Sequence, residues 1–82
     1  MGNYDRLLAK AVRNPAGLRF AELCRLAEDV GFEFSRQRGS HRIYRHHGLG
    51  MTLSFQDSRG QAKPYQVRQL LTIIAELGGS DE

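Results

Sequence analysis

The middle of the chain contains three short stretches of strand-like sequence, separated by glycine-containing turns. Residues 32–35 and 51–55 alternate apolar and polar side chains, and residues 40–46 contain the apolar pair Ile43 and Tyr44. The predicted turns are residues 37–39, 47–50 and 57–60. Short strands joined by short turns predict an antiparallel three-stranded sheet. Its apolar face is expected to hold Phe32, Phe34, Ile43, Met51, Leu53 and Phe55.

Apolar residues at helical spacing flank these strands and predict the elements that cover the sheet. A helix with the stripe Phe20, Leu23, Leu26, Ala27 and Val30 precedes the strands, and Gly31 is its expected C′ residue. A helix starting at Pro64 follows them, with the stripe Val67, Leu70, Leu71, Ile74 and Leu77 and its end at Gly78-Gly79. A shorter first helix carries Leu7, Leu8, Ala11 and Val12, with Asn3 as its expected N-cap. The order α-α-β-β-β-α predicts a two-layer α+β domain that resembles the double-stranded-RNA-binding fold.

Length and charge favour a single small domain that acts on a macromolecule. The chain has 82 residues, so residues 1–82 are expected to form one domain with little room for a deep pocket. Its net charge is +3, and residues 36–45 contain four arginines and no acid. Basic clusters of this kind are typical of proteins that bind phosphate polymers. The single cysteine, Cys24, excludes an internal disulfide framework and is expected to be buried.

The sequence also bears on localisation. It shows neither a signal peptide nor an apolar run long enough to span a membrane. The expectation is therefore a protein of the reducing cytoplasm.

The segment Gly39-Ser40-His41 is the strongest candidate for chemistry. An imidazole takes up and releases protons near neutral pH, as cleavage of RNA through its 2′-hydroxyl requires. If Ile43 faces the core, His41 lies at the rim of that face, and Arg42 and Tyr44 point to the open face. In an arbitrary Gly-Ser-His segment, the histidine more often only forms a hydrogen bond. The neighbouring arginines favour a catalytic role for His41 but do not decide between the two interpretations.

Lys63 precedes the last helix, where its charge meets the positive end of the helix dipole. A lysine beside free helix-terminal N–H groups can hold a phosphate, although an ordinary solvated lysine is an equal alternative. His46 and His47 are predicted to be solvated turn residues and not metal ligands. Tyr65 either supports the site or packs. The carboxylates Glu22 and Glu28 are interpreted as solvated.

Three sequence segments together resemble the HicA family of bacterial toxins. They are Arg13-Asn14-Pro15 with Arg19-Phe20, Glu22-Leu23 and Gly31-Phe32, then residues 36–44, and then residues 62–71 from Ala62-Lys63-Pro64-Tyr65 to Leu71. The resemblance implies a double-stranded-RNA-binding-like fold, ribosome-independent cleavage of mRNA, His41 as the catalytic histidine and inhibition by a HicB antitoxin. Some relatives carry a further histidine after the third strand, where this chain has Gln56.

The leading interpretation is a metal-independent endoribonuclease that needs no cofactor. In it, Arg36, Arg38, Arg42 and Lys63 hold phosphates, Gly39 and Ser40 shape the approach, and Tyr44 stacks a base. Two alternatives remain open. One is a non-catalytic double-stranded-RNA-binding module, and the other is an inactive protein that only pairs with an antitoxin.

Overall fold

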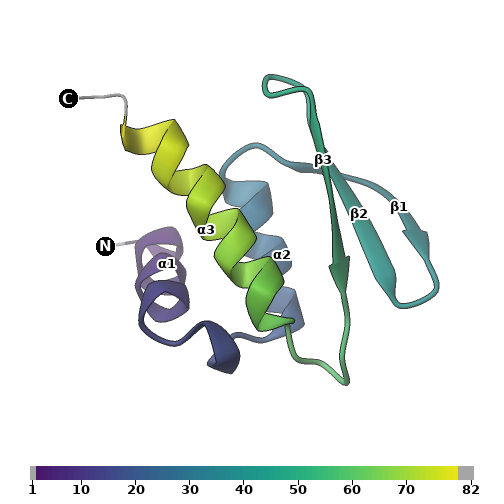
Figure 1. The fold of residues 1–82 in the computed structure, drawn as a ribbon, viewed down its shortest axis with the longest axis horizontal. Coiled ribbons are helices and arrows are strands. Elements are labelled where there is room, and N and C mark those ends of the chain that lie inside the picture. Colours follow the sequence, from purple (N-terminus) through teal and green to yellow (C-terminus); the bar gives the residue numbers. More distant parts are fainter. Residues whose placement is uncertain (1, 80–82) are drawn as a thin grey trace.

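The computed structural model describes residues 2–79 and contains three α-helices and one antiparallel sheet of three strands. The elements are α1 (Asn3–Arg13), the short 3-10 helix η1 (Pro15–Gly17), α2 (Phe20–Asp29), β1 (Glu33–Arg38), β2 (His41–His46), β3 (Met51–Gln56) and α3 (Pro64–Gly79). The strand order is β1-β2-β3, and the helices gather on one side of the sheet (Figure 1). This α+β architecture and its element order confirm the predicted fold class. Within the described range, no helix is long and apolar enough to cross a membrane.

The helices differ from the prediction mainly at their ends. Gly2, and not Asn3, is the N-cap of α1, and no side chain forms a capping hydrogen bond there. On α1 the stripe is narrower than expected, since Ala11 is buried but Val12 is largely exposed. Pro64 is the first residue of α3, as predicted, and this helix continues through Gly78 to Gly79, the last residue described.

The end of α2 depends on a histidine that the sequence did not single out as structural. Gly31 has a φ of +104°, and a Cβ at this position would lie 2.7 Å from His46 Nε2. His46 Nε2 donates to the carbonyl oxygen of Val30 over 3.0 Å, because Nδ1 is already the acceptor for the Leu49 N–H at 3.1 Å. The prediction of a solvated residue is therefore wrong for His46, whereas His47 is exposed as predicted.

The two faces of β2 are the reverse of those expected from the sequence. Tyr44 is fully buried against the helices, whereas Ile43 is only half-buried on the other face. The tyrosine can be buried because its hydroxyl donates to Glu28 Oε2 over 3.1 Å, so burial leaves no polar atom without a partner. Because adjacent residues of a strand point to opposite faces, His41 lies on the open face and Arg42 on the helix side. This hydrogen bond also shows that Glu28 is not simply a solvated carboxylate.

A β-bulge in β1 decides which of its residues share a face with His41. Phe34 pairs with Tyr44, but the next pair is Arg36 with Ile43, so Ser35 is an extra residue. Directly opposed residues point to the same face, and the bulge therefore places Arg36 and Arg38 on the open face.

The bulge leaves Phe34 on the helix side at the edge of the sheet. The predicted facing of Phe34 is therefore correct, but the residue is 49% exposed and the helices do not cover it as expected. The predicted core positions Phe32, Leu53 and Phe55 are buried, and Met51 is half-buried.

The loop after β3 is fixed against the start of α2. The N–H of Phe20 donates to the carbonyl of Gly60 over 3.0 Å, and the N–H of Ala62 donates to the carbonyl of Leu18 over 3.0 Å. Ala62 and Leu18 are both buried. These bonds fix the loop that leads into α3 against the start of α2.

Candidate functional site

The open face of the sheet carries polar side chains in rows that run across the three strands. At one end, His41 on the central strand lies between Arg38 on β1 and Gln56 on β3. In the next row, Ile43 lies between Arg36 and Ser54. His41, Arg36 and Arg38 are all exposed. Within residues 2–79, no hydrogen-bond partner occupies the His41 imidazole, so both ring nitrogens are free to meet a ligand.

The Gly39-Ser40 turn sets the position of His41. These two residues form the whole loop between β1 and β2, and Gly39 has a φ of +61°, which a glycine adopts without strain. The Gln37 side-chain amide donates to the Gly39 carbonyl over 3.1 Å, and the Asp57 N–H donates to the Ser40 carbonyl over 2.9 Å. The backbone immediately before His41 is therefore fixed by a residue of β1 and by the residue that follows β3.

Gln66 ties α3 to this end of the sheet, and the sequence analysis did not identify it. Its Oε1 accepts the backbone N–H of Gln56 over 2.9 Å, and its Nε2 donates to the Tyr65 hydroxyl oxygen over 3.2 Å. Gln66 is only 5% exposed, so these bonds satisfy a buried amide. The one feature of the sequence that could have indicated this role is the position of Gln66, a polar residue directly before Val67 of the apolar stripe.

Lys63 lies at the same end of the sheet as His41, because α3 begins there. It is half-buried and directly precedes Pro64. Its carbonyl accepts the N–H groups of Gln66 over 2.9 Å and Val67 over 3.1 Å, which forms the first turn of α3. The structure therefore brings Lys63, Gln56 and His41 to one corner, where β3 ends and α3 starts. Tyr65, in the first turn of α3, is largely exposed.

Tyr44 is not part of this site, and the prediction that it stacks a base is wrong. Its ring is fully buried, next to Cys24 and Phe55. Burial raises the pKa of the Tyr44 hydroxyl, and the neighbouring Cys24 thiol and Glu28 carboxylate raise that pKa further. Burial also raises the pKa of Cys24, so both groups stay neutral and serve the core.

Arg42 is also directed away from His41, contrary to the expectation that it lies on the open face. Its guanidinium carbon lies 4.9 Å from the centre of the Phe34 ring, a cation–π contact on the helix side of the sheet. Its Nε is buried and has no hydrogen-bond partner among the residues that the structure describes. Arg42 is therefore excluded from the cluster around His41.

An exposed histidine, with one arginine in its own row and another in the next row of an open sheet face, defines the site as a candidate surface for binding a phosphate polymer. A comparison with protein-family models identifies the family of the chain. The model described as the HicA toxin of bacterial toxin–antitoxin matches residues 20–76. The chain therefore belongs to the HicA toxin family of toxin–antitoxin systems, and this membership implies an antitoxin partner. Neither a search of curated proteins nor a search of solved structures returned a match.

Proposed function

We propose that this protein is a ribosome-independent endoribonuclease that cleaves mRNA and is inhibited by a HicB antitoxin. The observation that carries the proposal is the free imidazole of His41 in one row with Arg38, next to a second row with Arg36. Membership of the HicA toxin family supports the same reading. A double-stranded-RNA-binding-like mode of RNA contact fits the three-stranded sheet with its helices on one side.

In the proposed reaction, His41 acts as the general base. The imidazole takes the proton of a ribose 2′-hydroxyl, and the 2′-oxygen attacks the adjacent phosphorus. The bond from phosphorus to the 5′-oxygen breaks, which leaves a 2′,3′-cyclic phosphate and a 5′-hydroxyl. Arg38 and Arg36 stabilise the charge that develops on the phosphoryl oxygens. The imidazolium returns its proton to the leaving 5′-oxygen, so no net proton is consumed.

The remaining groups of the corner bind and orient the substrate. Gly39 lets the RNA backbone approach closely, and the Ser40 hydroxyl donates to a phosphate oxygen. The Gln56 side chain shares a face with His41, since the two residues are directly opposed in the register, and its amide is placed to hold a phosphate or a base. Lys63, at the positive end of the α3 dipole, holds a neighbouring phosphate. In the cytoplasm, the antitoxin would block cleavage by covering the open face that carries His41.

A purified-protein assay tests the catalytic assignment. Wild-type protein is expected to cleave labelled RNA in the presence of EDTA, and His41→Ala is expected to lower the rate by at least about 100-fold. His47→Ala is the matched control, because His47 is an exposed histidine at the opposite end of β2, 3.6 Å from Glu33. On expression in bacteria, His41→Ala should also abolish growth arrest.

Two results would contradict this proposal. If His41→Ala cleaved RNA at the wild-type rate, His41 would not be the catalytic group. If the wild-type protein bound RNA tightly without cleaving it, the non-catalytic RNA-binding module would be the correct function.

A further inference from the structure

A second basic surface lies between α1 and α2, apart from the site around His41. A groove of about 350 Å³ separates the two helices, and its charged lining consists of Arg6, Lys10, Arg13, Glu22 and Arg25. Figure 1 shows α1 and the sheet on opposite sides of α2 and α3. The groove and the open face of the sheet are therefore separated by the layer of helices.

The cations of α1 form a line along the groove. Arg6, Lys10 and Arg13 are spaced four and three residues apart, so they share one face of the helix. At 1.5 Å per residue, they extend over about 10 Å. Arg25 on α2 faces them across the groove. Four cations thus line the groove, and Glu22 is the one carboxylate among its lining residues.

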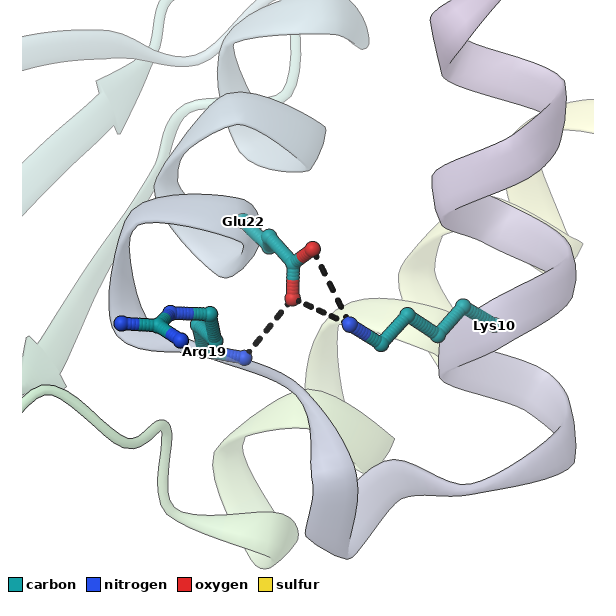
Figure 2. Close-up of polar contacts among 3 residues, drawn as sticks. All are labelled: Lys10, Arg19 and Glu22. Carbon is teal, nitrogen blue, oxygen red and sulfur yellow. Dashed lines mark hydrogen bonds and ion pairs between the residues drawn. The ribbon is translucent and has the colours of Figure 1, made fainter.

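The carboxylate of Glu22 is hydrogen-bonded to Lys10 and to the Arg19 backbone, so it does not occupy the arginines that line the groove. Glu22 accepts two hydrogen bonds from Lys10 Nζ, at 2.9 and 3.0 Å, and one from the Arg19 backbone N–H at 3.0 Å (Figure 2). Partial burial raises the pKa of Glu22, but these bonds outweigh it and hold the pKa below its ordinary value. Glu22 is therefore charged and neutralises Lys10, which corrects the prediction that it is a solvated carboxylate.

Three guanidinium groups remain for an anionic ligand. Arg6 and Arg13 are on exposed positions of α1. Arg25 lies 3.6 Å from Asp29, but its side chain is 55% exposed, and such surface pairs contribute little. Guanidinium groups bind phosphate oxygens with two parallel hydrogen bonds, which favours a phosphate ligand.

We propose that this groove binds the sugar-phosphate backbone of RNA outside the cleavage site. This inference rests on the proposed function, since it assumes that RNA is the substrate. A protein partner is less suited to the groove, because protein interfaces bury aromatic and apolar anchors beside their arginines, and Leu7 is the one large apolar residue in the lining. Residues 3–13 precede the family match at residues 20–76, so the α1 side of the groove lies outside the matched range.

RNA binding by a cleavage-deficient protein tests the groove. In the His41→Ala background, the double variant Arg6→Gln/Arg13→Gln is expected to weaken binding of a long single-stranded RNA about tenfold. Loss of two phosphate contacts should also reduce the slope of log affinity against log salt by about 1.4. Arg68→Gln is the control, since it removes one exposed charge of α3 that is not among the residues lining the groove. Arg6→Lys/Arg13→Lys should keep most of the affinity, and circular dichroism checks that each variant is folded.

The outcomes separate this inference from the proposed function. Cleavage of a dinucleotide by proteins with an intact His41 measures the catalytic site alone, and it should not differ between Arg6→Gln/Arg13→Gln and the wild type. If the wild type fails to cleave while the groove variant still loses affinity for long RNA, the catalytic proposal fails and the groove stands. If the groove variant and the control bind long RNA equally, the inference is wrong. If Arg6→Gln/Arg13→Gln kept its affinity for RNA but no longer bound the antitoxin, the inference would be overturned and the groove would be a site for a protein partner.

Discussion

Alternate residues of the single strand β2 belong to two different environments. On the helix side, Tyr44 and His46 have hydrogen-bond partners and packed neighbours. On the open side, His41 is exposed and Ile43 is half-buried. The difference indicates that the helix side carries the stability of the fold, because its side chains are fixed by tertiary contacts. The open side is left free for a ligand, so substitutions there should change function and leave stability nearly unchanged.

Truncation of Tyr44 is the strongest test of this comparison. Tyr44→Ala removes a fully buried ring that packs against Phe55, with 5.7 Å between ring centres, and it leaves Glu28 without its partner. Large-to-small changes of a buried aromatic residue cost about 3–5 kcal/mol of the free energy of unfolding. Ile43→Ala, its neighbour on the open face, should cost less than about 1.5 kcal/mol, because partly exposed sites lose less on truncation. Urea denaturation of both variants measures the two values, and equal losses would break the distinction between the faces.

Replacement of Gln66 tests whether the contact from α3 holds β3 in the position that the open face requires. Gln66→Leu removes the acceptor of the Gln56 N–H, and leaving such a group unpaired costs about 1–3 kcal/mol. The matched control is Gln69→Leu, at an exposed position of the same helix. Hydrogen exchange of the Gln56 amide should accelerate in Gln66→Leu and stay unchanged in the control.

The same variant separates positioning from stability. We expect Gln66→Leu to lower the rate of RNA cleavage at saturating RNA, since Gln56 and His41 are opposed in the register. Gln66→Glu keeps an acceptor for the Gln56 N–H and should restore most of the protection of this amide. If Gln66→Leu loses stability but cleaves RNA at the full rate, Gln66 has a purely structural role.

The order of elements was predictable from the sequence because each element has its own local signal. The apolar stripe of α2, the positive-φ glycine at position 31 and Pro64 at the start of α3 depend on spacing and backbone preference within a few residues. The position of Lys63 before α3 follows from the same local rules. Family membership was also predictable, since two of the three segments that carry the resemblance, residues 36–44 and 62–71, lie inside the matched range.

The facing of the strands was not predictable, because it depends on contacts between residues distant in the chain. Ile43 and Tyr44 are adjacent and both apolar in character, so the alternation fits either face. The partner that allows Tyr44 to be buried is Glu28, sixteen residues earlier. The bulge at Ser35 has no signal in the sequence, yet it decides that Arg36 and Arg38 share a face with His41. The role of Gln66 likewise depends on a strand that ends ten residues before it.

Two arginines four residues apart give the finest test of the two faces. Arg38 lies in the row with His41, whereas Arg42 lies on the helix side over Phe34. Arg38→Gln should weaken RNA binding by about 1 kcal/mol, or roughly fivefold, and lower its dependence on salt, with no change in the free energy of unfolding. Arg42→Gln should lose the cation–π contact, worth about 0.5–1 kcal/mol of stability, and keep its RNA affinity. Each variant is the control for the other, because both remove one charge from the same hairpin. The separation of binding from stability is wrong if Arg42→Gln weakens RNA binding as much as Arg38→Gln does.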